Sequence, residues 1–205
     1  MRKVEFDYDD LDESYFLGIA NVLLNKYYLR VNKSKYRLIE IEFYLKCNGH
    51  SDPYTHCDPD QLLMRSFYFH KFKTGTYKAG TFKGLDLTFG DANTDSYFGI
   101  LIRSVQKISK NSDNIIEGPC NTVNAFLKEY DCSSIMEFTK GKNLNIFSNK
   151  HNFVLVKDKT LEERQIWMGP RIGLSNKYPD YQNSNYRFVS DKSKIKKRKT
   201  SLVEV

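Results

Sequence analysis

The chain has 205 residues, of which 40% are hydrophobic and 14% aromatic, so it can fill the core of one domain. It contains no run of about 18 apolar residues, so no membrane-spanning helix is expected. The charged N-terminus lacks the apolar segment of an export signal, so export is not expected either. The net charge of +7 permits a polyanionic partner. The four cysteines form no CxxC pair and are expected to be reduced thiols.

The chain is expected to begin with an arm and a helix. Residues 1–11 are acidic and irregular, and we assign them to an N-terminal arm. A helix is predicted from Asp12 or Glu13 to about Leu24, with Asp12 as the candidate N-cap.

The next stretch, residues 36–45, alternates in the period-two pattern of a strand with two different faces. With a strand expected at residues 27–31 and a turn at residues 32–35, it is predicted to form a hairpin. The core face is expected to hold Ile39, Ile41, Phe43 and Leu45. The other face is expected to hold Leu38, Glu40, Glu42 and Tyr44. This polar face is either a solvated sheet surface or the wall of a pocket that carries an acid or base.

A long loop and two more strands follow. Residues 46–61 form a polar loop with two Asp-Pro turns. Within the glycine-rich residues 75–90, the alternation of residues 85–89 predicts a strand. Residues 97–105 are predicted as another strand. Phe98, Ile100 and Ile102 are expected on one face, and Tyr97, Leu101 and Arg103 on the other.

The last part of the chain is predicted to contain a helix, short strands and a tail. A helix should follow Gly118-Pro119, with an apolar stripe of Val123, Phe126, Leu127 and Tyr130. Residues 146–147 and 153–156 are short strand candidates. The folded domain is expected to span residues 12–190, and the Lys-rich residues 191–205 to form a basic, disordered tail.

The loop contains four residue types that bind zinc, namely Cys47, His50, His56 and Cys57. Their spacing matches no familiar zinc knuckle, and the adjacent His56 and Cys57 would chelate a metal awkwardly. The chain also lacks the glycine motifs of nucleotide-binding loops and the nucleophile elbow of hydrolases. We therefore expect no metal and no cofactor.

Several motifs resemble those of the alkyladenine (3-methyladenine) DNA glycosylases. Arg37-Leu-Ile-Glu-Ile-Glu42-Phe-Tyr44-Leu, followed by a loop with His56, resembles the family segment Arg-Ile-Val-Glu-Thr-Glu-Ala-Tyr-Leu…His. Ile100-Leu-Ile-Arg103 resembles the family strand Val-Leu-Leu-Arg, and Gly118-Pro119 resembles its helix start. Pro170-Arg171-Ile-Gly-Leu and Arg187-Phe-Val resemble its last motifs. The five motifs occur in the family's order and span about residues 12–190.

The resemblance implies a single α+β domain with a curved, mostly antiparallel sheet flanked by helices. It implies a monofunctional N-glycosylase that flips a modified base out of the duplex and hydrolyses its glycosidic bond. Glu42 matches the general base of the family. Tyr44 and His56 match the residues that hold the flipped base, and Arg103 matches the Arg on the neighbouring active-site strand. Alternatively, His56 only stabilises a turn.

The chain also departs from the family and resembles a diverged branch with its own pocket. Lys83 stands where the family has its intercalating Tyr, Gly80 replaces its second stacking Tyr, and Gly90 replaces its pocket Asn. We assign Lys83 and Asp86 to the substrate pocket of this branch. The candidates for an aromatic wedge are Phe82, Tyr77 and Tyr54.

The expected partner is DNA, either duplex or single-stranded, bound by a monomer inside the cell and in the nucleus if the source is eukaryotic. The residues expected to contact the nucleic-acid backbone are Arg171, Lys194, Lys196, Lys197, Arg198 and Lys199. Two alternatives stay open: a protein of the same fold that acts on RNA or a nucleoside, and a nucleic-acid-binding protein without catalysis. Release of a base from a defined oligonucleotide would distinguish the DNA glycosylase from both alternatives.

Overall fold

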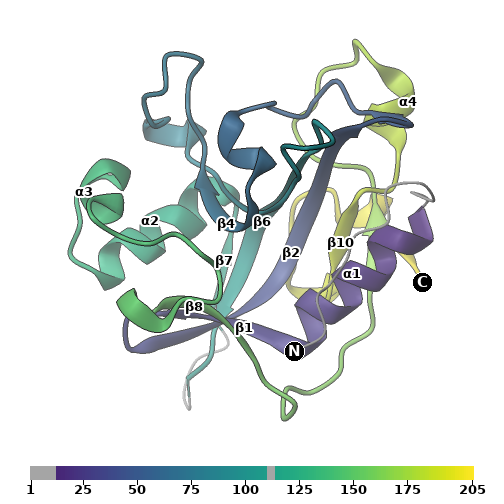
Figure 1. Ribbon diagram of the computed structural model, residues 1–205. Helices are drawn as coiled ribbons and strands as arrows, with labels where there is room; N and C mark the ends of the chain where they lie inside the picture. The colour runs from purple at the N-terminus through teal and green to yellow at the C-terminus, as the bar shows by residue number, and fades with distance from the viewer. Residues whose placement is uncertain (1–12, 110–113) are drawn as a thin grey trace.

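The fold is organised around one long strand, β2 (Ser34–Cys47), in a computed structural model that describes residues 13–109 and 114–205 (Figure 1). One edge of β2 pairs along most of its length with β6 (Tyr97–Lys107). The other edge is shared: β1 (Tyr27–Val31) pairs with its start and β10 (Arg187–Val189) with its middle. The expected N-terminal arm and the N-cap at Asp12 lie outside the described residues.

The described residues form four α-helices, α1 (Glu13–Lys26), α2 (Pro119–Glu129), α3 (Ile135–Thr139) and α4 (Pro179–Asn183). The remaining strands are β3 (His50–Ser51), β4 (Met64–Phe69), β5 (Leu85–Phe89), β7 (Ile115–Glu117), β8 (Phe153–Lys157), β9 (Trp167–Gly169) and β11 (Val203–Glu204). Short 3₁₀ turns are η1 (Pro59–Leu62), η2 (Gly80–Phe82), η3 (Asn149–His151), η4 (Lys192–Lys194) and η5 (Lys199–Ser201).

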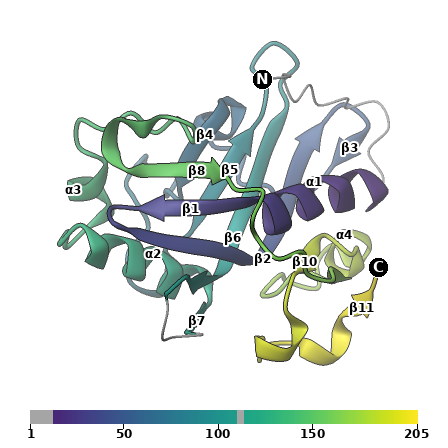
Figure 2. The same cartoon turned by 90° about the horizontal axis from the view of Figure 1, so that it is seen from below.

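These strands form one curved sheet whose main order is β11-β9-β10-β2-β6-β5-β4, and each pairing between its strands is antiparallel. β1 pairs with both β2 and β8. Figure 2 shows the C-terminal segment beside β10, on the opposite side of the molecule from α3. The α+β class is thereby confirmed. None of the helices in the described part of the chain is long and apolar enough to cross a membrane.

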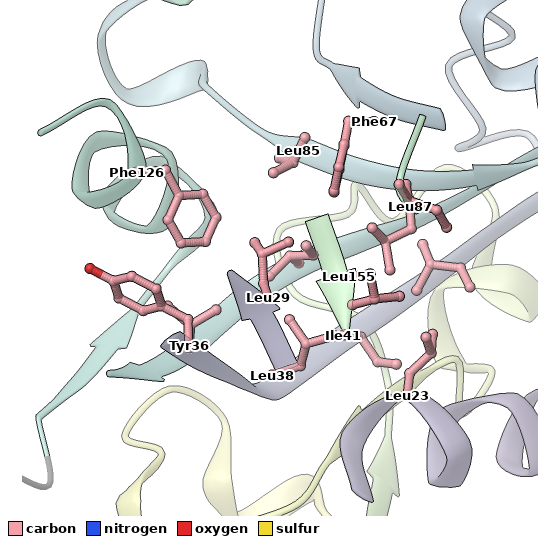
Figure 3. Packing of buried hydrophobic residues seen from close by; sticks show 14 of the residues in the cluster. Leu23, Leu29, Tyr36, Leu38, Ile41, Phe67, Leu85, Leu87, Phe126 and Leu155 are labelled. Atoms are coloured by element: carbon pink, nitrogen blue, oxygen red, sulfur yellow. The ribbon is translucent and has the colours of Figure 1, made fainter. Parts of the chain in front are cut away.

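The main apolar core lies where α1, α2 and the β1–β2–β8 strands meet (Figure 3). α1 buries Phe16, Ala20, Leu23 and Leu24, the spacing of one helix face. α2 begins at Pro119, directly after Gly118, whose φ of 100° suits a residue without a side chain. The predicted hairpin, both predicted later strands and this helix are confirmed. The strand predicted at residues 146–147 is wrong, because the chain turns there.

The predicted alternation of β2 is wrong at two positions because the strand contains a bulge. Leu38 pairs with Val105 and Glu40 with Ser104, so Ile39 is an extra residue on β2. Leu38 therefore enters the main core, whereas Ile39 points into a second apolar cluster on the other side of the sheet. Beyond the bulge the prediction holds, since Ile41, Phe43 and Leu45 are in the main core.

The prediction that residues 191–205 are disordered is also wrong. β11 pairs with β9, and Ile195 and Leu202 are 1% and 3% exposed. These two side chains pack with Ile39 and Val189 in the second apolar cluster. The segment is therefore ordered by two apolar residues within a charged sequence, and the expected domain boundary at residue 190 is not observed.

Candidate active site

One row of side chains crosses four strands of the sheet on the same face. Glu42 on β2 is the cross-strand partner of Leu101 on β6. Leu101 in turn pairs with Asp86 on β5, and Asp86 pairs with Tyr68 on β4. Neighbouring strands lie about 4.8 Å apart, so the Cα atoms of Glu42 and Asp86 are roughly 10 Å apart. The sheet thus places two buried carboxylates on one face with a single leucine between them.

The carboxylate of Glu42 is fully buried and held on both oxygens. Oε1 accepts a hydrogen bond from the backbone N–H of Ile172 (2.7 Å), and Oε2 accepts from the hydroxyl of Tyr44 (2.9 Å). The Nη1 of Arg103 lies 3.4 Å from Oε2. Burial raises the pKa of Glu42, and the charge of Arg103 opposes this only in part. Glu42 is therefore a stronger base than an exposed carboxylate.

Tyr44 separates Glu42 from a small pocket of about 120 Å³. The pocket is lined by Tyr44, Tyr54, His56, Gln61, His70, Asp86, Leu101 and Leu174. The structure therefore brings four predicted residues to one cavity, namely Tyr44, His56, Asp86 and the wedge candidate Tyr54. Glu42 and Arg103 lie directly behind Tyr44, outside this lining.

The ring of Tyr44 rests on a buried arginine. The guanidinium carbon of Arg171 lies 4.5 Å from the Tyr44 ring centroid. Arg171 and Asp52 are both fully buried, with Nη1 to Oδ2 at 2.5 Å and Nη2 to Oδ1 at 3.2 Å. The prediction that Arg171 contacts a nucleic-acid backbone is therefore wrong, because the side chain is enclosed and committed to Asp52. Its place in the site is as a support for Tyr44.

The far wall of the pocket is a polar cluster that sequence reasoning found only in part. Asp86 lies 2.7 Å from His70 Nε2 and accepts from Gln61 Nε2 at 3.3 Å. A Cβ on Gly99 would lie 2.5 Å from Asp86 Oδ2 and 2.6 Å from Gln61 Nε2, and one on Gly84 would overlap the His70 ring. Glycines at these positions make the room for the cluster. A glycine within or next to a strand indicates that another group approaches the backbone closely, and this was the sequence signal that could have led to His70 and Gln61.

His56 lies at the mouth of the pocket with an exposed edge. Its Nε2 is 3.3 Å from Lys78 Nζ, and its Nδ1 is 3.4 Å from the hydroxyl of Tyr68. Lysine only donates, so Nε2 accepts and Nδ1 carries the proton in the neutral ring. Partial burial, with His70 and Lys78 nearby, lowers the pKa of His56, so the ring is neutral at pH 7.

Lys83 does not lie where it was predicted. Its Nζ donates to Asn124 of α2 (3.0 Å), and it lines a separate groove with Tyr77 and α3. Tyr77 is packed against the main core, and the hydroxyl of Tyr54 donates to Ser175 O (2.5 Å). Phe82, which is 71% exposed, is the wedge candidate whose ring is free of the core.

The lysines of the C-terminal segment lie on the surface, apart from the pocket lining. Lys194 lies 3.7 Å from Asp191, and Lys199 donates to Ser193 O (3.3 Å). The side chains of Lys196, Lys197 and Arg198 are exposed. Contact of these cations with a nucleic-acid backbone stays a prediction.

The fold and site together define a single α+β domain with a buried carboxylate behind a small polar pocket. No family model matches the chain. The chain is 53% identical to the uncharacterized protein L759 of Acanthamoeba polyphaga mimivirus over an alignment of 212 positions. The alignment covers 98% of this chain and 97% of the mimivirus protein. It therefore belongs to the family of that mimivirus protein.

Proposed function

We propose that the protein is an N-glycosylase that hydrolyses the bond between a modified base and its sugar in DNA. The observation that carries the proposal is the contact between the buried Glu42 and Tyr44, whose ring forms one wall of the pocket. A carboxylate with a raised pKa at such a place is suited to general-base catalysis near neutral pH.

In the proposed reaction, a water molecule in the pocket attacks the anomeric carbon of the sugar. The bond from this carbon to the base nitrogen breaks, and its electron pair leaves with the base. The proton of the water passes to the oxygen of Tyr44 while the hydroxyl proton of Tyr44 passes to Oε2 of Glu42. Tyr44 thus relays the proton to a carboxylate that the pocket does not reach directly. Arg103 keeps Glu42 in place through its contact with Oε2.

The size of the pocket fits a flipped base better than a whole nucleoside. Its volume of about 120 Å³ is below the roughly 300–1,000 Å³ of sites for larger ligands. The rings of Tyr44 and Tyr54 offer stacking surfaces, and the wall of His70, Asp86 and Gln61 offers polar groups to the edge of a base. The exposed lysines of the C-terminal segment offer charge to phosphates.

A second candidate is action on an unpaired base, in single-stranded DNA or RNA, or on a nucleoside. It is favoured by Lys83, which stands in place of an aromatic wedge and bonds to Asn124. Without a wedge, extrusion from paired DNA loses stacking of about 1–3 kcal/mol. A third candidate, binding without catalysis, is favoured by the enclosure of Glu42 behind Tyr44.

The test is a panel of duplex and single-stranded DNA and RNA oligonucleotides with modified bases, and the matching free nucleosides. Oligonucleotides are treated with alkali to reveal abasic sites, and released base is measured by chromatography. Release from DNA supports the proposal, whereas release from RNA or nucleosides alone moves the assignment to the second candidate. A mobility shift without release of any base would overturn the enzymatic reading.

A further inference from the structure

A chain of buried ions connects the C-terminal segment, residues 191–205, to Glu42. Its central member is Glu40, which is 1% exposed. Oε1 of Glu40 accepts from Nε of Arg187 (2.6 Å) and lies 3.3 Å from Nε of Arg103. Oε2 accepts from the hydroxyl of Ser104 (2.5 Å). Glu40 therefore has two arginines as partners, and only one of them also contacts Glu42.

Arg103 is the shared member of this chain. Its Nε contacts Glu40, and its Nη1 contacts Glu42 at 3.4 Å. Arg187 is fully buried on β10, as the cross-strand partner of Glu42. With Arg187 in place, the two carboxylates have two guanidinium groups between them. Without it, both would compete for Arg103.

The C-terminal segment supplies the remaining partners of Arg187. Nη2 donates to the backbone carbonyl of Lys197 (2.9 Å), and Nη1 donates to that of Arg198 (3.3 Å). Arg198 has a φ of 45°, in the left-handed region that non-glycine residues seldom adopt. Such a turn is kept where neighbouring contacts determine it, and here it presents two successive carbonyls to one side chain.

The segment is held in this position by contacts at both ends of the turn. Ile195 and Leu202 pack on Ile39, the residue that the bulge of β2 turns to this side of the sheet. The carboxylate of Glu117 accepts hydrogen bonds from the backbone N–H groups of Lys196 and Lys197. The bulge that displaces Ile39 thus creates the docking site of the segment directly beside Glu40.

We propose that the C-terminal segment positions the catalytic carboxylate. Its two carbonyls hold Arg187, Arg187 neutralises Glu40, and Arg103 is thereby left to pair with Glu42. The inference rests on the proposed function of Glu42. It makes Arg187 a positioning residue, because its own contacts are to Glu40 and the segment.

Loss of Arg187 has a defined electrostatic consequence. The charged or polar groups around Glu42 are Arg103, Glu40 and Tyr44, with Arg171 beneath Tyr44 and Arg187 across the strand. Removing Arg187 leaves Glu40 with Arg103 as its remaining arginine partner, so the negative charge of Glu40 beside Glu42 is less compensated and Arg103 is drawn toward Glu40. Both changes favour the protonated form of Glu42. The acid limb of the pH–rate profile should therefore move to higher pH.

The experiment compares Arg187→Met with Arg37→Met in the intact chain. Arg37 is a matched control: it is a buried arginine of β2, and it donates to Glu162 O (2.6 Å) and Asn25 (2.8 Å). The pH dependence of single-turnover base release is measured from pH 5 to about 9. Arg187→Met should move the acid limb upward by about one pH unit. Arg37→Met should leave the limb at its wild-type pH even where the protein is less stable.

Arg187→Lys keeps the charge and should shift the limb less than Arg187→Met. If the Met variant fails to fold, Arg187→Gln, which also removes the charge, serves as the test, and an unmoved limb in Arg187→Gln overturns the inference. Titration of the Glu42 carboxyl carbon by NMR, assigned by its absence in Glu42→Gln, gives the same comparison without activity. If Glu42→Gln is inactive but the acid limb of Arg187→Met stays at its wild-type pH, the inference about Arg187 is overturned while the proposed function stands. Full activity of Glu42→Gln overturns the proposed function itself.

Discussion

Asp52→Ala is predicted to be strongly destabilising although Asp52 is not part of the pocket lining. The substitution leaves the guanidinium of Arg171 fully buried, with the carbonyls of Phe43 and Tyr181 as its remaining acceptors. Removing one partner of a buried ion pair costs about 3–5 kcal/mol. For a chain of this length, 1 kcal/mol shifts the melting temperature by about 2–4 °C, so the expected decrease is about 6–20 °C. Thermal and urea unfolding measure it.

The matched control is Asp60→Ala. Asp60 pairs with Lys71, but the two side chains are 34% and 20% exposed, so solvent screens the pair. Such pairs contribute about 0–1 kcal/mol. If Asp52→Ala lowers the free energy of unfolding by no more than Asp60→Ala does, Arg171 has other means of compensation. The argument that it is locked beneath Tyr44 would then be refuted.

Three further predictions concern the site. Gly99→Ala should fold but lose base release, because its Cβ collides with Asp86; Gly18→Ala, with open space around it in α1, should keep full activity. Because burial raises the pKa of Glu42 above 4.5, the folded protein holds this proton more tightly than the unfolded chain. Stability should therefore fall as pH rises from 4.5 through the raised pKa, and Glu42→Gln should lack this fall in urea unfolding. If the protein is the proposed glycosylase, with Lys83 where the family it resembles has an aromatic wedge, unpaired lesions should be released faster than paired ones, and equal rates in matched and mismatched duplexes would contradict this.

Local sequence patterns were sufficient to predict β2, the strand that carries the site, and its polar face. The alternation of Glu40, Glu42 and Tyr44 predicts their common face because the extra residue on β2, Ile39, precedes Glu40. The second register shift, between Glu40 and Ile41, places its extra residue, Arg103, on β6 and leaves the alternation of β2 intact. The bulge itself could not be predicted, since Leu38 and Ile39 are both apolar and fit either face. The placement of Arg103 opposite these carboxylates required the family resemblance to pair two strands far apart in the sequence.

The missed parts of the site depend on contacts distant in the chain. His70 and Gln61 become site residues only because β5 and η1 meet beside Gly99. The order of the C-terminal segment depends on Ile195 and Leu202, whose burial outweighs the charged composition that suggested disorder. Composition measures the average of a segment, whereas docking depends on where its few apolar residues meet an open sheet edge.

The most direct test of the account is single-turnover base release by the wild-type protein, Glu42→Gln and Glu129→Gln. Glu129 is a matched control, since it is a part-buried carboxylate bonded to Lys107 and Tyr36, outside the pocket. The substrate is the oligonucleotide that the panel of modified bases identifies. The account predicts that Glu42→Gln binds it normally but releases base about 10²–10⁴-fold more slowly, while Glu129→Gln keeps the wild-type rate. Equal rates for Glu42→Gln and the wild-type protein would contradict the account.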